Sequence, residues 1–305
     1  MRRIIIDCDP GIDDAQAIMM AYQYPEVKIE AITTVASNVG VDLTTANTLK
    51  VLDALNAEEI PVYAGAKSGL VQTSPNVSIV HGKDGLGDAD IPTSNRHVAE
   101  GPAALALIQL ANAYPEEVEL IAIGPLTNLA LAIRLDPDLA SRYKHLVIMG
   151  GAYFAQGNTP NHPAKFNIFA DADAAAVVFE NWFGFTMISW EATVAHGISM
   201  EALTSLLVYD NPRSQFLAKI SEKPLNFMAK RLNRNMSFTA SPLAMAVLLE
   251  PEIVLVSEQK YVQIERYGQL SRGMTVVDWL GLSHQSPNTN IVLEVDTYRF
   301  FHLLK

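Results

Sequence analysis

The sequence has almost no cysteine and no long apolar segment. Cys8 is the only cysteine, so an intrachain disulfide is impossible and a zinc site with several thiolates is excluded, which favours a reducing cytoplasm. No run of about 18 apolar residues occurs, and only three isoleucines separate Arg3 from Asp7, too few for the apolar region of a signal peptide. We therefore expect a soluble, cytoplasmic protein with no membrane partner.

Basic residues are also scarce. The chain contains 22 Lys and Arg against 33 Asp and Glu, a formal net charge of −11, and no run rich in Lys or Arg. Such a charge repels a phosphate backbone, so we expect a small-molecule ligand and no nucleic acid. The hydrophobic content of 49% over 305 residues indicates a folded globular protein.

Short apolar runs alternate with segments of helical periodicity over the first two thirds of the chain. Strands are predicted at residues 3–7, 27–35, 61–64, 118–123, 145–149 and 185–189. Helices are predicted in the segment that follows the first strand and at 42–57, 101–114, 126–135 and 171–183. This alternation predicts an α/β fold with a mostly parallel central sheet and helices on both faces.

The remaining third of the chain has a different pattern. Helices are expected from Trp190 to about Leu249, followed by apolar or alternating runs at 253–256, 261–264, 274–279 and 290–295. No linker or repeat marks a boundary, so residues 1–305 are expected to form a single domain. Two long loops, 67–100 and 150–167, are expected near the carboxyl ends of the strands, where ligands bind in open α/β sheets.

The most informative segment follows the first predicted strand, where residues 7–15 read DCDPGIDDA. Strand alternation directs Asp7 and Asp9 to the same side, and the Pro-Gly turn allows Asp13 and Asp14 to approach them. Two like charges about 4 Å apart repel by roughly 4 kcal/mol at an effective dielectric near 20, so something must neutralise the cluster. Oxygen ligands without Cys or His favour Ca²⁺ or Mg²⁺ over zinc.

A structural alternative exists for each acid taken alone. Asp13 and Asp14 could interact with the dipole of the following helix, and Asp9 could cap it. These roles account for one or two acids but not for four, so we favour a metal or catalytic carboxylate site. Cys8 is expected to be a small buried residue, because flanking carboxylates raise the pKa of a thiol.

The chain resembles the nucleoside hydrolases that prefer inosine and uridine, whose signature is D-x-D-P-G-x-D-D-A at the first strand. Further matches follow in order: ITTV at 32–35 with Asn38 after it, HG at 81–82, GPLTN at 124–128, MGG at 149–151, FNIF at 166–169 and GMTV at 273–276. The resemblance spans almost the whole chain. It implies release of a base and ribose from a ribonucleoside, a role in purine or pyrimidine salvage, and a homodimer or homotetramer.

The resemblance also implies roles for individual residues. A Ca²⁺ ion would be held by Asp9, Asp14, the main-chain carbonyl of Ile123 and the residue at position 241, and would carry the attacking water. Asp9 would take the proton of that water. Asp13, the second catalytic carboxylate, would hold a ribose hydroxyl. Three asparagines would complete the sugar contacts: Asn38, Asn158 and Asn167. Asp7 is expected to position the cluster through hydrogen bonds.

The chemistry suits these residue types. Cleavage of an N-glycosidic bond passes through an oxocarbenium-like transition state, so anionic oxygens near the sugar stabilise the developing positive charge. A bound cation lowers the pKa of the attacking water.

The sequence departs from this family at three positions of the expected site. Ser241 and Ala240 stand where active members carry Asp, often preceded by His, so a charged metal ligand and an acid for the leaving base are missing. Ser241 is expected to cap the late helix, with Pro242 at its first position. Lys165 stands where the family has Glu, and either faces the pocket and partly replaces the cation or points outward into solvent.

Two further residues have open assignments. His81, in a glycine-containing loop, either lines the pocket or caps the turn. Phe227 could stack on the base, with Arg231 or Arg234 stabilising the departing anion, whereas the alternative is a surface helix with a core Phe. The other histidines show no ligand spacing and receive no role.

Three hypotheses for function follow. The first is a ribonucleoside hydrolase assisted by calcium, possessing reduced or altered activity because of Ser241 and Ala240. The second is a catalytically degenerate member that binds a ribosylated ligand without efficient turnover. The third is a haloacid-dehalogenase-like phosphotransferase, which also has Asp-x-Asp after its first strand but normally has a Gly-Thr step that this chain lacks.

Overall fold

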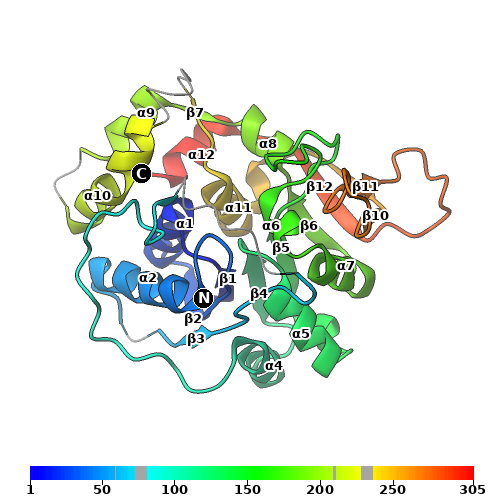
Figure 1. The fold of residues 1–305 in the computed structure, drawn as a ribbon, viewed down its shortest axis with the longest axis horizontal. Helices are drawn as coiled ribbons and strands as arrows, with labels where there is room; N and C mark the ends of the chain where they lie inside the picture. The colour runs from blue at the N-terminus through cyan, green and yellow to red at the C-terminus, as the bar shows by residue number, and fades with distance from the viewer. Residues whose placement is uncertain (59, 73–80, 209–210, 228–235) are drawn as a thin grey trace.

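The structure is a computed structural model of residues 1–305, and it describes all of them except 59, 73–80, 209–210 and 228–235. The described elements begin with a regular alternation of strands and helices (Figure 1). They are β1 (Arg2–Cys8), α1 (Ile12–Gln23), β2 (Val27–Thr34), α2 (Val41–Ala54), β3 (Val62–Ala64), α4 (Ala103–Ala113), β4 (Val118–Ala122), α5 (Thr127–Leu135), η1 (Leu139–Arg142), β5 (His145–Met149), α6 (Phe166–Ala170), α7 (Ala172–Asn181) and β6 (Phe185–Ile188).

The strands of this alternation form one large sheet. Its order over the described residues is β3-β2-β1-β4-β5-β6-β12-β9, with β12 at Thr289–Val295 and β9 at Val254–Lys260. Every pairing is parallel except that of β12 with β9. The predicted α/β class with a mostly parallel sheet is therefore confirmed.

Helices cover both faces of the sheet, as the buried side chains of β1 show. Ile4 and Ile6 pack in the cluster that includes α1, α2 and α11 (Ala240–Leu249), whereas Ile5 packs in the cluster of α4, α5 and α7. Successive residues of a strand point to opposite faces, so an uninterrupted isoleucine run is typical of a strand buried on both sides.

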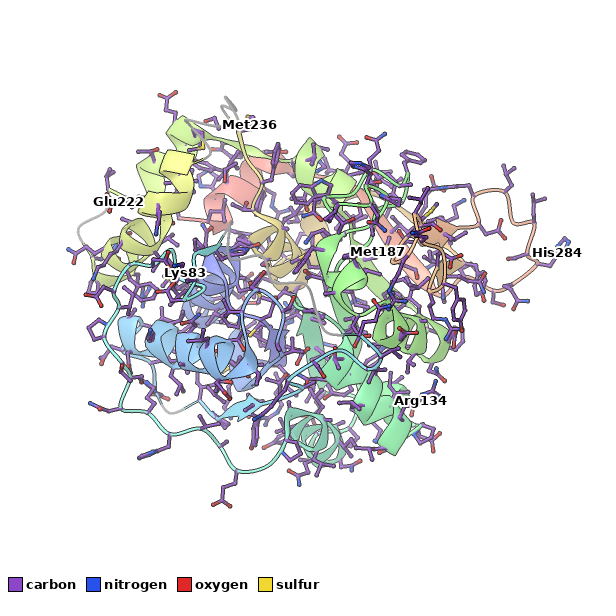
Figure 2. All side chains as sticks on the ribbon, in the orientation of Figure 1. Lys83, Arg134, Met187, Glu222, Met236 and His284 are labelled. Atoms are coloured by element: carbon purple, nitrogen blue, oxygen red, sulfur yellow. The ribbon has the colours of Figure 1, made fainter. Side chains whose placement is uncertain are left out.

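The last third of the chain adds helices and short strands to this core. They are α8 (Trp190–Ala195), β7 (Ile198–Ser199), α9 (Met200–Leu206), α10 (Pro212–Phe227), β8 (Met236–Ser237), η3 (Pro251–Ile253), β10 (Val262–Ile264), β11 (Thr275–Val277) and α12 (Thr297–Leu303). The pair β10–β11 and the residues after it form an arm that projects from the sheet (Figure 1), and Figure 2 shows His284 near its tip. Over the described residues, no helix is long and apolar enough to span a bilayer.

The chain folds so that its signature segment meets the late helix α11. Strands β1 and β4 are neighbours, but the chain leaves β1 toward β2 and β3 and leaves β4 toward β5 and β6. Such a reversal of strand order opens a crevice at the carboxyl ends of the strands, where ligands bind in open α/β sheets. Helix α1 starts from this edge and packs against α11.

Candidate active site

A pocket of about 250 Å³ lies at this edge of the sheet. Its wall includes Asp9 directly after β1, Ile123 directly after β4 and Met149 at the end of β5. Most of the residues predicted for the site line it: Asp9, Asp13, Asp14, Asn38, His81, Ile123, Asn158, Lys165 and Asn167. The sequence motifs that were far apart therefore converge on one cavity.

Asp9 is fixed by the backbone that follows β2. The Asn38 N–H donates to Asp9 Oδ2 at 3.1 Å, and the Asn38 side chain donates through Nδ2 to the Asp9 carbonyl at 2.9 Å. Burial raises the pKa of Asp9 to about 7; the Asn38 N–H lowers it, the charge of Asp13 raises it and the charge of Lys165 lowers it. Asn38 thus orients Asp9.

Asp13 and Asp14 lie in the first turn of α1 and face α11. The Gly11 N–H donates to Asp14 Oδ2 at 3.2 Å, which is the N3 half of a capping box, since the N-cap Gly11 has no side chain to complete it. The Ser241 hydroxyl of α11 donates to Asp13 Oδ2 at 3.1 Å and lies 3.4 Å from Asp14 Oδ1. Burial, followed by the charges of Asp13 and Asp9, holds the pKa of Asp14 well above its usual range.

The predicted capping role of Ser241 is wrong. Helix α11 begins at Ala240 and its N-cap is Thr239, whose carbonyl accepts the Leu243 N–H at 3.2 Å. Ser241 therefore sits inside the first turn, fully buried, with its hydroxyl directed at the acids of α1. Because α1 packs on α11, the Ser241 hydroxyl finds two carboxylate acceptors. It therefore donates to them and does not cap its own helix.

Lys165 faces the pocket. Its side chain is buried at the N-cap of α6, with Nζ 3.5 Å from Asn167 Oδ1 and 5.7 Å from the centroid of the Trp190 ring. Burial lowers the pKa of Lys165, whereas the charges of Asp13, Asp9 and Asp14 raise it. Over the described chain, Lys165 makes no ion pair within 4.0 Å, although it lines the same pocket as the acids.

Asn167 and Asn158 hold the loop that carries Lys165. Asn167 Nδ2 donates to the Ile123 carbonyl at 2.6 Å and to the Met149 carbonyl at 3.1 Å, which ties α6 to the ends of β4 and β5. Asn158 Oδ1 accepts the Phe166 N–H at 2.9 Å. The Ile123 carbonyl, predicted as a metal ligand, is thus already an acceptor for a side chain.

His81 lines the pocket, and its ring contacts the start of α1. Its Nδ1 accepts the Ile12 N–H at 3.3 Å, which places the proton of the neutral ring on Nε2. Burial lowers its pKa, against a raising effect of Asp13. The ring lies so close to Gly11 that a Cβ there would be 2.5 Å from His81 Nδ1.

Asp7 lies behind the pocket and not in its wall. Its Oδ1 accepts hydrogen bonds from Thr33 at 2.5 Å and Asn128 at 2.8 Å, and its Oδ2 has no partner in the described part of the chain. Burial raises the pKa of Asp7 to about 7, although these two hydrogen bonds lower it. It links β1 to β2 and α5, which fits a positioning role.

The pocket also contains residues that the sequence analysis missed. Trp190 and Phe238 contribute aromatic rings to the wall, packed edge to face with centroids 6.0 Å apart. Trp190 follows β6, so the rule that ligands gather at carboxyl ends of strands could have found it. Phe227 ends α10, but its side chain lies outside the described residues, as do Arg231 and Arg234.

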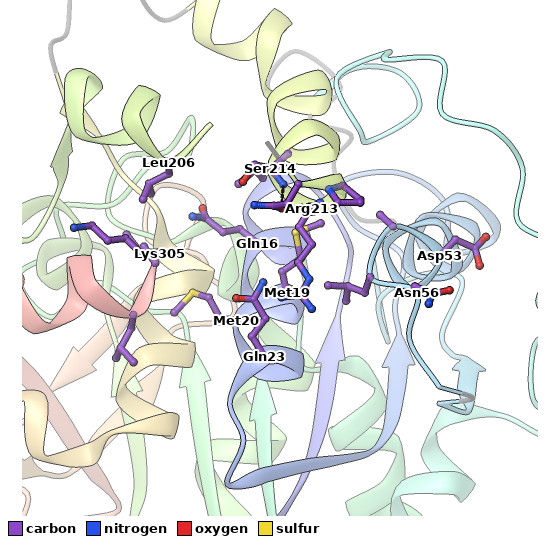
Figure 3. A pocket seen from close by; sticks show the side chains of 17 residues that line it. Gln16, Met19, Met20, Gln23, Asp53, Asn56, Leu206, Arg213, Ser214 and Lys305 are labelled. Carbon is purple, nitrogen blue, oxygen red and sulfur yellow. Dashed lines mark hydrogen bonds between the residues drawn. The ribbon is translucent and has the colours of Figure 1, made fainter. Parts of the chain in front are cut away.

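A larger cavity of about 720 Å³ lies farther along α1, between α1, α2, α10 and α12 (Figure 3). Gln16 and Leu217 line both cavities. The larger one contains a single carboxylate side chain, that of Asp53, among residues such as Met19, Met20 and Arg213. It lacks convergent acids, so the smaller pocket is the candidate active site.

A mostly parallel sheet with carboxylates gathered in a pocket at its carboxyl edge is an arrangement found in many α/β enzymes. Comparison with known proteins gives the family. Residues 4–302 match the inosine-uridine preferring nucleoside hydrolase family. The chain belongs to this family, whose members generally depend on a metal ion, and the predicted resemblance is confirmed.

Individual relatives agree with this assignment. The chain is 33% identical to an inosine-uridine preferring nucleoside hydrolase of Leishmania major, over 99% of this chain and 96% of that protein. It is also 33% identical to the pyrimidine-specific ribonucleoside hydrolase RihA of Escherichia coli strain K12, with the same coverage. The structure of an inosine-guanosine nucleoside hydrolase matches with a TM-score of 0.92 at 34% identity, covering 99% of this chain and 97% of that one. These relatives support enzyme activity on nucleosides and leave the phosphotransferase alternative without support.

Proposed function

We propose that the chain hydrolyses the N-glycosidic bond of ribonucleosides to give a free base and ribose. The observation that carries this proposal is the convergence of Asp9, Asp13 and Asp14 on one pocket of a nucleoside hydrolase fold. A cavity of about 250 Å³ with acids at one end and the rings of Trp190 and Phe238 in its wall suits a polar sugar and a flat base.

In this proposal Asp9 is the general base. A carboxylate with a pKa near 7 is well matched to proton abstraction at neutral pH, and the Asn38 N–H holds it in one orientation. Water attacks the anomeric carbon as Asp9 takes its proton, the carbon–nitrogen bond breaks, and its electron pair leaves with the base. Asp13 accepts a hydrogen bond from a ribose hydroxyl, and its negative charge stabilises the cationic sugar in the transition state.

The acid that protonates the leaving base is not Ala240, which has no proton to give. His81 carries its ring proton on Nε2 and lines the same pocket. Its lowered pKa makes it a hydrogen-bond donor more than an acid, so the base departs with hydrogen-bonding assistance only. We therefore expect slower turnover than in nucleoside hydrolases that have an acid at the position of Ala240.

The calcium ion that the resemblance implies fits these residues poorly. Of its four expected ligands, the Ile123 carbonyl already accepts Asn167 Nδ2 and the Ser241 hydroxyl donates to the acids. Across the described residues, no group of three or more His, Cys, Asp or Glu side chains has a metal-binding arrangement. Calcium assistance stays a prediction, and we assign no catalytic step to the ion.

The second candidate function is binding of a ribosylated ligand without turnover. It is favoured by the neutral residues Ser241 and Ala240 at the start of α11, where the resemblance implies a charged ligand and an acid. Both functions use the same pocket, so an activity measurement separates them.

The experiment measures free base, by chromatography in phosphate-free buffer, from a panel of purine and pyrimidine ribonucleosides. Asp9→Asn should lower turnover about 10³-fold, since general-base catalysis contributes roughly 10²- to 10⁴-fold. Asp138→Asn, at an exposed aspartate of η1, should leave turnover unchanged. Absence of turnover with thermal stabilisation by a ribonucleoside would support the binding function. Turnover that Asp9→Asn leaves unchanged would refute the proposed mechanism.

A further inference from the structure

We propose that the positive charge of this site is part of the chain itself: the ammonium of Lys165 takes the place of a divalent cation, and the pocket works without bound calcium. The inference deepens the proposed function and rests on it for its catalytic consequence. Its structural half concerns only how the acids are neutralised and can be tested without substrate.

Lys165 is held in the pocket by the backbone. It is the N-cap of α6, and its carbonyl accepts the N–H groups of Ile168 and Phe169, each at 3.0 Å. The side chain is 6% exposed, lies over Trp190 and reaches Asn167 Oδ1. A buried lysine requires compensating negative charge, and the acids that line the same pocket supply it.

The acids already accept hydrogen bonds from the protein. Asp9 Oδ2 already accepts the Asn38 N–H and Asp14 Oδ2 accepts the Gly11 N–H, so each carboxylate has one oxygen bound to the backbone. The remaining Asp14 oxygen lies 3.4 Å from the Ser241 hydroxyl. Ca²⁺ takes six to eight oxygen ligands and is held best by charged ones, whereas the Ser241 hydroxyl beside Asp14 is neutral, so this site offers one carboxylate fewer than the resemblance implies.

The positive charge of Lys165 also repels a divalent cation in the pocket. Its ammonium lines the same cavity as the three acids, so an ion between them would approach one positive charge in order to reach the negative ones. Ser241 adds no charge to compensate, because a hydroxyl is neutral. The chain thus replaces an exchangeable cation by a fixed one.

The space between Lys165 and the acids suits a vicinal diol. No ion pair closes it within 4.0 Å over the described residues, and the lysine ammonium is a donor whereas the carboxylates are acceptors. A sugar hydroxyl between them can donate to Asp13 or Asp14 and accept from Lys165 at the same time. We expect Lys165 to orient the sugar in place of a metal ion.

The first test measures calcium binding alone, by calorimetry on the full-length protein after treatment with a chelator. The wild type should show no binding at micromolar calcium. The double variant Lys165→Glu with Ser241→Asp removes the ammonium and adds two carboxylates beside Asp13 and Asp14, so it should bind calcium at least 100-fold more tightly. Micromolar or tighter binding by the wild type would overturn the inference, as would a double variant that folds and gains no affinity.

A matched control separates local geometry from total charge. Ser221→Asp with Lys223→Glu makes the same chemical changes at a buried serine elsewhere in the pocket wall and at an exposed lysine. It should not gain calcium affinity. An equal gain in this control would show that only net charge matters, and would overturn the assignment to Lys165 and Ser241.

The second test concerns turnover. Lys165→Met should raise KM for ribonucleosides and lower kcat/KM at least 100-fold, added calcium should not restore it, and Lys165→Arg should restore part of it. Full activity of Lys165→Met, or rescue of it by calcium, would overturn the inference. If the wild type cleaves no ribonucleoside at all, the proposed function fails, and the calcium titration still decides how the acids are neutralised.

Discussion

At the scale of residues, the site is a set of buried ionisable groups that are each fixed by a backbone contact. Asn38 fixes Asp9, Gly11 fixes Asp14, and the N-cap position fixes Lys165. Buried charges are costly unless paired or hydrogen-bonded, so such a cluster persists only where its interactions offset that cost. The pKa values of Asp7 and Asp9, raised to about 7 by burial, show how strongly these positions disfavour charge.

Gly11 offers a test of the geometry at this scale. Gly11→Ala places a Cβ against the His81 ring, so the ring must move and we expect kcat/KM to fall about 10- to 100-fold. Gly40→Ala is the matched control, because Gly40 is likewise a helix N-cap with φ below zero and nothing lies within 4 Å of its added Cβ. Turnover and thermal stability should be measured for both. Equal activity of the two variants would contradict the role of His81.

Sequence reasoning found the acids but could not place every partner. The spacing of Asp9, Asp13 and Asp14 at a strand-to-helix junction predicts convergence, because local geometry alone decides it. The direction of Lys165 depends on how the loop at 150–167 folds onto β4 and β5, and the acceptors of Ser241 depend on the packing of α11. Those contacts are between segments far apart in the chain, which residue spacing does not encode.

At the scale of elements, β1 connects the site to the end of α11. Arg2 at its start donates to the carbonyls of Leu248 at 2.6 Å and Leu249 at 2.8 Å, and pairs with Glu119 of β4. The last carbonyls of a helix have no partners within it, so a guanidinium there is stabilising. One end of α11 is thereby held by Arg2, while its other end places the Ser241 hydroxyl against Asp13 and Asp14.

The ion pairs of Glu119 predict a pH-dependent stability. Burial favours protonation, but the ion pairs with Arg2 and Lys144 prevail and lower the pKa of Glu119. A lowered carboxyl pKa stabilises the fold above the unfolded-state value, near 4.5, and this contribution is lost as the pH falls through the folded-state pKa. Glu119→Gln should therefore lower the free energy of unfolding by about 2 kcal/mol at pH 7 and by much less below pH 4.

Denaturant titration at several pH values checks this prediction. The control is Glu117→Gln, whose exposed carboxylate pairs with Arg3 at 3.3 Å and should contribute less than about 1 kcal/mol. A loss for Glu119→Gln that is the same at pH 4 and pH 7 would contradict the electrostatic explanation.

Most elements could be predicted because their patterns are local. The six strands before Trp190 and the five helices predicted between them appear within a few residues of their predicted bounds, whereas the short helices η1 and α6 were not predicted. The two-residue strands β7 and β8 escaped prediction, because they are too short for any periodicity and form only by pairing with each other. The antiparallel placement of β9 beside β12 depends likewise on tertiary packing.

At the scale of the whole molecule, the acidic surface and the exposed arm are the main features. The net charge of −11 disfavours anionic polymers as partners, whereas a neutral nucleoside is not repelled. On the arm and the loop within it, several large apolar side chains are exposed: Tyr267, Leu270, Leu280 and Leu282. Clusters of exposed apolar side chains commonly mark contact surfaces.

Oligomeric state is predicted from the family resemblance. We expect light scattering after size exclusion to give a mass of two or four times 33.3 kDa. A monomer at micromolar concentration would contradict the expectation of a homodimer or homotetramer, without bearing on the pocket chemistry.

The most direct test of the central claim is a crystal structure of Asp9→Asn with a bound ribonucleoside. We predict the sugar in the pocket of about 250 Å³, its diol between Lys165 and the carboxylates of Asp13 and Asp14, and its anomeric carbon facing residue 9. A ribonucleoside bound in the larger cavity beside Arg213, or a pocket that stays empty at saturating ligand, would contradict the account.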